Sequence, residues 1–576
     1  MSTDTSDQAG GPAGLADVTD LTTERVMGIE TEFGVLHTDP ETRSRAGAGS
    51  AVGLSHLVVG AYALLDPHEG ERGSRVRWDY GDETPLRDAR GFDLQRAAAH
   101  PTQLTDEVHE AHLPSAPSLP SVELDAPAAG PETAPDGDDA EVLSWAAQRS
   151  IGNAVLANGA RWYVDHAHPE YSAPEVTRAR EAVVADRAGE EIARRAMGIL
   201  EAADGIPGVT LYKNNTDGKG ASYGTHENYL VEREVPFERL TAAMLPFLST
   251  RQVLVGAGRV GLGPRGEQPG YQISSRADFM EAEVGLETTL NRPIVNTRDE
   301  PHADPSRFRR LHVIIGDANL LEESTFLKLG STSLVLAALE AEHRTGHAIL
   351  PDLRLADPVA AVHTISHDPT LRATVPLTDG RELTALQIQR AHLEALEPLC
   401  DPGDEETAAV LRTWGELLDL LEQDPALAAD RIEWVAKLQL LERYRARHGL
   451  EWGDPRLSLI DLQFSDLRPS RGLFAKLRAA GAVGTLVAQE EVDAAITTPP
   501  ASTRAHLRGR LIAAHREHVP SAGWDAITLA GPDGGHRLRL ADPRLGSASW
   551  CQAHGIDLRG GVEQILDSLR RAVGEH

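Results

Sequence analysis

Hydrophobic and polar residues alternate most clearly in the segment that begins near Arg25 and ends near Val35. Side chains at positions 29, 31, 33 and 35 fall on one side, whereas Glu30 and Glu32 fall on the other. This two-residue period predicts a β-strand. A second strand is predicted over 161–165, where Arg161, Tyr163 and Asp165 share the face opposite to positions 162 and 164.

The spacing of hydrophobic residues changes along the rest of the chain. Helices alternate with strands from 141 to about 330, and the pattern is mainly helical from 331 to about 450, with Gly449 as an expected C-cap. The apolar run 57–65 is too short to span a bilayer. The Thr-Thr-Pro-Pro stretch at 497–500 marks an expected boundary before a small α/β unit.

These changes predict a multidomain chain, as its 576 residues also suggest. We expect a disordered acidic tail over 1–24, a catalytic domain over 25–496 and a small C-terminal domain over 497–576. The catalytic domain should contain an insertion with a loop over 37–80 and a proline-rich acidic linker over 104–140.

The net charge of −31 is concentrated in two segments. Residues 1–24 carry five acidic side chains and residues 104–142 carry ten, with no Lys or Arg in either. Without them the chain keeps about −16, a charge that attracts neither nucleic acid nor anionic membranes. Two cysteines and no signal-peptide pattern favour a reducing cytoplasm.

Several predicted strands carry ligand-type side chains on one face. Glu30 and Glu32 would repel each other unless a divalent cation or a shared proton compensates, although a solvated strand face is an equally good explanation. Glu281 and Glu283 repeat this spacing, and Arg310 and His312 share another strand face. Oxygen-rich clusters with one or two imidazoles suit Mg²⁺ better than zinc.

The two histidines of the segment 163–175 have two interpretations. His166 and His168 could hold zinc, but no compelling third ligand occurs nearby in the sequence. Histidines that flank a carboxylate more often support it by hydrogen bonding. We therefore favour the supporting role.

Two further features are compatible with an acidic or phosphorylated ligand. The segment 213–228 is rich in glycine, amides and lysine, but lacks the spacing of a P-loop. Nine arginines and no lysine occur between Arg251 and Arg310. Half of them should form ion pairs, and the remainder could line a groove for an acidic ligand. Trp434 is either a core residue or a stacking wall for a purine.

Four motifs together closely resemble the Pup ligase/depupylase family, whose relatives include glutamine synthetase and the carboxylate-amine ligases. They begin at Gly28, Arg161, Asn214 and Asn296 and read Gly-Ile-Glu-Thr-Glu-Phe-Gly, Arg-Trp-Tyr-Val-Asp-His-Ala-His-Pro-Glu-Tyr, Asn-Asn-Thr-Asp-Gly-Lys-Gly-Ala-Ser-Tyr-Gly-Thr-His-Glu-Asn and Asn-Thr-Arg-Asp-Glu-Pro-His-Ala-Asp. The resemblance runs from about Arg25 to the C-terminus. It implies an α+β fold, in which a glutamine-synthetase-like large domain has a curved antiparallel sheet, flanking helices and a site for ATP and Mg²⁺. It also implies a small C-terminal α/β domain.

Carried over to matching positions, the resemblance implies roles for individual residues. Asp165 would be the catalytic carboxylate. The nucleotide contacts would be Arg161, Arg310 and Trp434. The candidate magnesium ligands are Glu30, Glu32, Tyr163, Glu170, His226 and His312.

Within this family the sequence favours the branch that removes Pup over the branch that attaches it. The long insertion between the first two motifs, with Arg-Trp-Asp-Tyr at 77–80, is absent from the ligases, and His166-Ala-His168 also matches the depupylating branch. The resemblance implies hydrolysis of the side-chain amide of Pup's C-terminal glutamine and of the isopeptide bond to substrate lysines, with ATP as a bound cofactor. Pup is a small acidic protein of the proteasome pathway. A Pup ligase that consumes ATP and a non-catalytic Pup-binding adaptor are the alternatives, and we expect a monomer.

Overall fold

The central element of this computed structural model is an eight-stranded sheet. The structure describes residues 20–39, 49–70, 75–95, 137–148, 151–206, 208–288, 291–531 and 534–573. The strands lie in the order β13 (Met280–Gly285), β14 (Arg292–Asn296), β15 (Phe308–Val313), β10 (Thr225–Glu232), β1 (Met27–Glu32), β8 (His168–Ser172), β7 (Arg161–Asp165) and β6 (Asn153–Val155).

The sheet is mixed, whereas an antiparallel sheet was expected. Neighbouring strands from β14 to β6 pair antiparallel, but β13 and β14 pair parallel at the edge. Side-chain alternation specifies which face of a strand is buried, but not the direction of the neighbouring strand. The expected strand over 25–35 divides into β1 and β2 (Gly34–His37), and β2 pairs with β9 (Val209–Tyr212).

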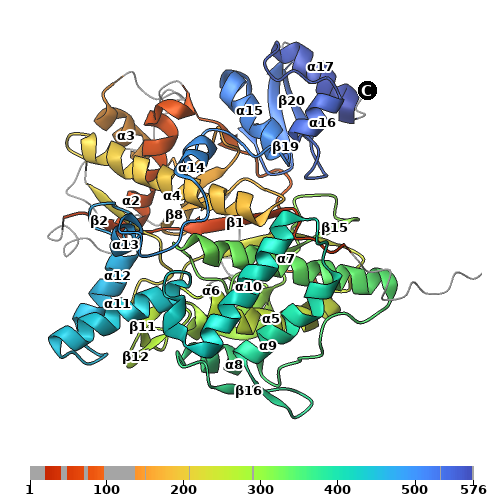
Figure 1. Cartoon of the computed structure of the whole chain (residues 1–576). Coiled ribbons are helices and arrows are strands. Elements are labelled where there is room, and N and C mark those ends of the chain that lie inside the picture. Colours follow the sequence, from red (N-terminus) through yellow and green to blue (C-terminus); the bar gives the residue numbers. More distant parts are fainter. Residues whose placement is uncertain are drawn as a thin grey trace, which may run out of the picture.

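Helices cover one face of the sheet (Figure 1). The packing pairs are α2 (Gly49–Leu65) with β7 and β8, α4 (Ala179–Ala202) with β1, α7 (Glu322–Thr345) with β10, and α5 (Phe237–Thr250) with β14. Ile29, Trp162 and Tyr229 are buried on this face. On β10 the even-numbered residues are half-buried and the odd-numbered ones buried. The polar side chains of the central strands therefore project from the opposite face.

The region after α7 is mainly helical, as predicted. It contains α8 (Pro358–Ser366), α9 (Ala385–Leu396), α10 (Glu405–Gln423), α11 (Glu433–His448), α12 (Pro455–Phe464), α13 (Leu473–Ala479) and α14 (Gln489–Ala495), with one hairpin formed by β16 (Thr374–Pro376) and β17 (Glu382–Thr384). Gly449 adopts the left-handed conformation (φ 61°) and ends α11, which confirms the predicted C-cap.

A four-stranded sheet forms the C-terminal unit, at the upper right of Figure 1. Its strands β18 (Ser521–Ala522), β19 (Ala526–Gly531) and β20 (Gly534–Arg539) are joined by β3 (Arg77–Trp78). Helices α15 (Ala505–His515), α16 (Ala548–Ala553) and α17 (Val562–Val573) share a hydrophobic core with this sheet. A strand from the predicted loop over 37–80 therefore belongs to the C-terminal sheet.

The predicted tail, loop and linker lie only partly within the described residues. Residues 1–19, 40–48, 71–74 and 96–136 lie outside them. Leu21 donates its backbone N–H to the Leu399 carbonyl at 3.0 Å, and Thr23 is buried, so residues 20–24 pack against the protein instead of extending the tail. Residues 49–65 form α2 inside the predicted loop. Across the described chain, no helix is both long and apolar enough to cross a membrane.

Candidate active site

Strand pairing brings the predicted site residues together on the open face of the sheet. Glu30 lies opposite His226 on β10 and opposite Ser172 on β8. Glu170 lies between Glu32 on β1 and Tyr163 on β7. Residues far apart in the sequence thus form one surface because the register of the central strands is fixed.

Three carboxylates form the acidic centre of this surface. One oxygen each from Glu32, Asp165 and Glu170 lies within 4.8 Å of the others. Glu170 is 1% exposed, and its Oε1 accepts hydrogen bonds from Tyr163 at 2.7 Å and Ser172 at 3.1 Å. Its buried Oε2 has no partner in the described part of the chain.

Electrostatics show that the Glu170 carboxyl lacks a compensating positive charge among the described residues. Burial raises the pKa of the Glu170 carboxyl well above its ordinary value, and the negative charges of Asp165, Glu30 and Glu32 raise it further. An unpaired buried oxygen among carboxylates is the donor set that a hard divalent cation prefers, so the residues fit Mg²⁺. Asp165, predicted only as the catalytic group, lies within this donor set.

The imidazoles lie beside the acidic centre. His226 Nδ1 is 3.2 Å from Glu30 Oε2, and the rings of His226 and His312 have centroids 5.1 Å apart. Asn228 donates to Glu30 Oε1 at 2.8 Å, and its Oδ1 contacts His312 Nδ1 at 2.8 Å and accepts from Arg310 at 3.1 Å. Asn228 therefore connects three predicted site residues, and its position two residues after His226 on one strand was the overlooked signal.

Two pKa shifts follow from this arrangement. Burial opposes ionisation of Glu30, but the hydrogen bond and charge of His226, with Arg310 and Asn228, lower the pKa of the Glu30 carboxyl to about 2. Burial, reinforced by the charges of Arg310 and His226, lowers the pKa of His312 well below its ordinary value. A neutral imidazole is the form that binds a metal ion.

Asp165 stands at the tight turn between β7 and β8. The turn places His166 in the left-handed region (φ 52°), with its Nδ1 3.1 Å from Asp165 Oδ2. Burial opposes ionisation, but the charge and hydrogen bond of His166, with the charges of His226 and Arg161, lower the pKa of Asp165 to about 2. Asp165 is therefore an anion at neutral pH.

His168 points to a different carboxylate. Its Nδ1 lies 3.5 Å from Glu32, and its ring stacks on Tyr223 with centroids 4.1 Å apart. The two histidines thus contact separate carboxylates, His166 contacting Asp165 and His168 contacting Glu32. The hydrogen bond of His166 to Asp165 agrees with the supporting role favoured above, whereas His168 Nδ1 has no hydrogen-bond partner among the described residues.

The predicted nucleotide arginines border the same surface. The Arg161 guanidinium lies 3.8 Å from the Tyr163 ring centroid and 4.2 Å from that of Trp78, and its Nε donates to Asn153 at 3.1 Å. Arg310 lies 3.6 Å from Glu300, and its Nε and Nη2 have no hydrogen-bond partner among the described residues.

A cleft next to Arg310 has an aromatic wall, but Trp434 is not part of it. Its lining includes Gly28, Ser172, Arg310 and Trp524. Trp434 is 0% exposed, and its indole N–H donates to the Val253 carbonyl at 2.8 Å within the core. Trp524 was missed because its sequence neighbourhood carries no motif and only the fold brings it to the sheet. The predicted pair Glu281 and Glu283 is exposed on the edge strand β13, away from this surface.

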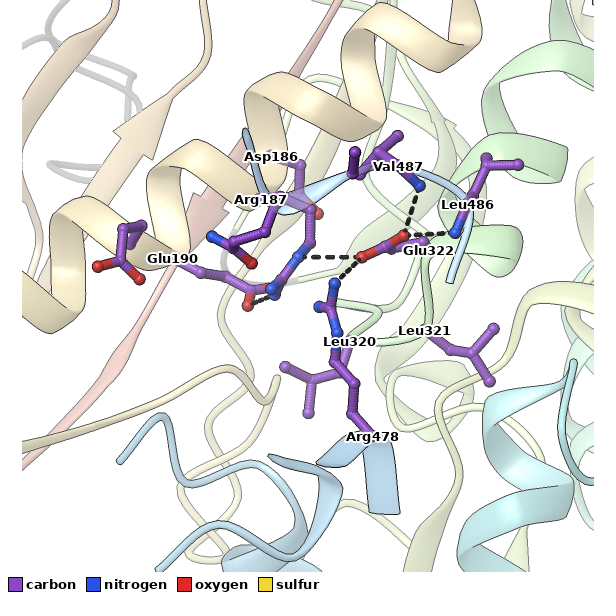
Figure 2. A network of polar contacts seen from close by, with 12 residues as sticks. Asp186, Arg187, Glu190, Leu320, Leu321, Glu322, Arg478, Leu486 and Val487 are labelled. Carbon is purple, nitrogen blue, oxygen red and sulfur yellow. Dashed lines mark hydrogen bonds and ion pairs between the residues drawn. The ribbon is translucent and has the colours of Figure 1, made fainter. Parts of the chain in front are cut away.

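A network of buried ions holds the helix-covered face behind the site. Thr31, between Glu30 and Glu32, donates to Asp186 at 3.2 Å, and Lys213 contacts Asp186 at 2.6 Å and Glu190 at 3.0 Å. Figure 2 shows the adjoining part, where Glu322 binds Arg187 at 3.3 Å, Arg478 at 2.7 Å and the backbone N–H groups of residues 486 and 487. The network joins β1, α4, α7 and the α13–α14 segment.

Comparison with known proteins agrees with this architecture. The family model described as Pup-ligase protein matches residues 25–528. A Pup deamidase/depupylase of Mycolicibacterium smegmatis is 45% identical over 553 residues, covering 96% of this chain and 98% of that protein. A Pup–protein ligase of Acidimicrobium ferrooxidans is 45% identical over 413 residues, covering 70% of this chain and 88% of that protein.

Two solved structures share the fold. A complex between Pup and its ligase PafA has a TM-score of 0.70 at 31% identity, covering 95% of this chain and 93% of that chain. The ligase PafA in complex with ADP has a TM-score of 0.65 at 35% identity, covering 79% of this chain and 98% of that chain. With its site on the open face of an eight-stranded mixed sheet, the chain belongs to the Pup-ligase protein family.

Proposed function

We propose that this protein is an amide hydrolase that converts the C-terminal glutamine of Pup to glutamate and cleaves the isopeptide bond between Pup and substrate lysines. The observation that carries the proposal is the nearly full-length similarity to a Pup deamidase/depupylase, compared with the 70% of this chain covered by a Pup–protein ligase. The insertion that favours the depupylating branch supports the proposal as well, because it is part of the folded protein. The backbone N–H of Ala89 donates to the Thr297 carbonyl at 2.8 Å, and β3 pairs with β18.

Asp165 would be the catalytic carboxylate. Its low pKa makes it an anion, which can attack the amide carbonyl, accept a proton from water or orient a nucleophilic phosphate. In each case water is consumed overall, the C–N bond breaks, and the nitrogen leaves as ammonia or as the lysine amine. His166 keeps the Asp165 carboxylate oriented toward the open face of the sheet.

The proposed cofactors are ATP and Mg²⁺. Glu32 and Glu170 would hold the cation at the acidic centre. The further candidate ligands Glu30, Tyr163, His226 and His312 lie on the same face of the sheet. The cation supplies positive charge that polarises oxygen ligands. ADP in the related ligase structure supports a nucleotide site, which we place between Arg161 and Arg310. We assign the purine-stacking role to Trp524 because Trp434 has no exposed surface.

The remaining parts of the proposal follow the family resemblance. Pup and pupylated proteins are the proposed partners, which the complex of Pup with a related ligase supports. We further propose a monomer in the cytoplasm, a glutamine-synthetase-like large domain over 25–496 and a C-terminal domain over 497–576. The hydrophobic core around β18–β20 supports a C-terminal domain that also takes in Val76, Trp78 and Val155 from the earlier part of the chain.

The decisive experiment is replacement of Asp165 by Asn. The wild type should release ammonia from Pup that ends in glutamine, converting the amide to the acid by mass spectrometry, with no ATP consumed per turnover. D165N should lose amide cleavage and still bind ATP and Pup. Turnover by the variant contradicts the assignment of Asp165.

The same assay separates the alternatives. Stoichiometric ATP hydrolysis with attachment of Pup to lysine would identify a ligase. Binding of Pup without any amide cleavage would identify an adaptor, against which the complete set of carboxylates argues.

A further inference from the structure

Two buried arginines beside the acidic centre form no direct ion pair with any described residue. Within the range 251–310, Arg251 pairs with Glu227 at 2.5 Å and Arg307 with Asp542 at 3.1 Å. Arg276 is 1% exposed and Arg292 is 7% exposed, yet no carboxylate of the described residues lies within 4.0 Å of either guanidinium. The charge of Glu32 attracts both guanidinium groups from a greater distance. Burial of a cation that forms no direct ion pair is nevertheless costly, so this pair requires an explanation.

Both arginines hold the end of the glycine-rich loop against the acidic centre. Arg292 Nη2 donates to the Ser222 carbonyl, and Arg276 Nη1 donates to the Thr225 carbonyl at 3.2 Å. Gly224, between these two contacts, lies so close to the site that a Cβ there would be 2.9 Å from Glu32 Oε1. The arginines therefore bracket a four-residue segment that borders the carboxylates.

Each guanidinium keeps unused donors. Arg276 Nε is buried without a partner, and its Nη2 donates to no described residue. Arg292 uses Nε, which donates to the Thr288 carbonyl at 2.7 Å, and Nη2, whereas its Nη1 donates to no described residue. Burial, reinforced by the charge of Arg292, lowers the pKa of Arg276 to about 9, so it is still a cation at neutral pH. Two adjacent cations with free donors form a site for an anion.

The substrate of the proposed reaction supplies a suitable anion. The reacting amide belongs to the side chain of a C-terminal glutamine, so the α-carboxylate of that residue is free in Pup and in its conjugates. When the amide reaches Asp165, this carboxylate must also approach the ionised Asp165 side chain at the acidic centre, which repels it. A cation pair at the border of the acidic centre would compensate that repulsion.

We propose that Arg276 and Arg292 bind the α-carboxylate of the substrate's C-terminal residue and thereby restrict cleavage to a terminal glutamine. This inference rests on the proposed function. It predicts that the enzyme does not cleave glutamine within a chain, where the α-carboxyl is part of a neutral peptide bond.

The test compares two forms of Pup that end in glutamine, one with a free α-carboxylate and one with a neutral α-N-methylamide. Ammonia release reports only the side-chain reaction in both. A charge-assisted hydrogen bond contributes about 1.5–3 kcal/mol, so the wild type should lose about 10- to 100-fold in kcat/KM with the methylamide.

Substitutions then assign this discrimination to the arginines. R276M and R292M should both be slow with the free acid and should discriminate less than about threefold between the two substrates. R276K, which keeps the charge, should retain part of the discrimination. R265M removes an exposed arginine near Gly220 of the same loop, where an added Cβ would lie 3.2 Å from Arg265 Cγ, and this variant should discriminate like the wild type. The inference is overturned if R276M and R292M both discriminate between the two substrates as strongly as the wild type does. It is also overturned if the wild type does not discriminate between them.

Equilibrium binding separates this inference from the proposed function. D165N should bind the free acid about 10- to 100-fold more tightly than the methylamide, and the Asp165→Asn/Arg292→Met double variant should not. If the wild type cleaves no amide, the proposed function fails, and the ratio of the two Kd values still decides whether the arginines bind the α-carboxylate. Should R276M fail to fold, R292M and R276K carry the same comparison.

Discussion

Buried carboxylates lie on both sides of strand β1, but the two sides differ in whether every carboxylate has a cationic partner. On the helix-covered face, Asp186 and Glu190 share Lys213, and Glu190 also contacts Arg194 at 3.1 Å. On the open face, Glu170 has a buried oxygen without a partner. The pKa values differ accordingly, since that of Glu190 is lowered to about 2 and that of Glu170 is raised well above its ordinary value.

This difference shows that a buried carboxylate does not by itself identify a functional site. What matters is whether the protein supplies the compensating charge. Each carboxylate of the network of Figure 2 has a cationic partner, so the network is complete in charge. The acidic centre is incomplete because Glu170 has no such partner in the described part of the chain, and the proposed Mg²⁺ would supply the missing charge. The following experiments test this contrast.

The largest effect is expected when the complete network loses its lysine. K213M leaves Asp186 and Glu190 without the buried ammonium and should lower the free energy of unfolding by about 3–5 kcal/mol. Urea denaturation measures the change. R344Q, which breaks the exposed pair with Glu232, should cost less than about 1 kcal/mol. Equal effects of the two substitutions would contradict a structural role for the network.

A pH dependence of nearly the same size is expected from Glu190. Burial raises its pKa, but the charges of Arg187 and Lys213 lower it from 4.5 to about 2 in the folded protein. A lowered pKa stabilises the fold fully above the unfolded value, and this stabilisation is lost as pH falls from about 4.5 to 2. The difference in unfolding free energy between wild type and E190Q should therefore shrink by about 3 kcal/mol over that range. A difference that does not change with pH would exclude this linkage.

The incomplete centre should respond to a cation instead. Mg²⁺ at about 100 times its Kd should stabilise the wild type by about 2.7 kcal/mol, measured as a rise in Tm. E170Q should lose most of this rise while unfolding no more easily than the wild type without Mg²⁺, because the high pKa already favours the neutral carboxyl. E281Q, on the exposed edge strand, is the control and should keep the full response.

The smallest effect concerns the nucleotide. W524A should weaken ADP binding about tenfold, because stacking of a base on an aromatic ring contributes about 1–3 kcal/mol. W434L should instead lower stability and leave the affinity of the folded protein for ADP unchanged. Isothermal titration calorimetry gives both affinities, and loss of ADP binding only in W434L would return the stacking role to Trp434.

Much of the site could be predicted because its residues alternate on strands. Glu30, Glu32, Arg161, Tyr163 and Asp165 share faces that the two-residue period already assigns. Their closeness to one another could not be derived in this way, since it depends on which strands become neighbours.

Other residues were overlooked in the sequence for the same physical reason. Trp524 lies far from the motifs in sequence, and only the pairing of β3 with β18 brings it next to Trp78, with ring centroids 5.1 Å apart. Trp434 is the opposite case: the family resemblance implied a nucleotide contact, but the side chain lies in the hydrophobic core. The parallel edge pair β13–β14 was missed because alternation contains no information on strand direction.

The pairing of β3 with β18 also has a consequence for biosynthesis. Arg77 is made early, but its partner Ser521 leaves the ribosome only when nearly the whole chain has been synthesised. The C-terminal sheet therefore cannot close during most of translation, and its closure is among the last folding events. A ribosome that stalls before this point would present a chain whose cleft beside Arg310 still lacks its Trp524 wall.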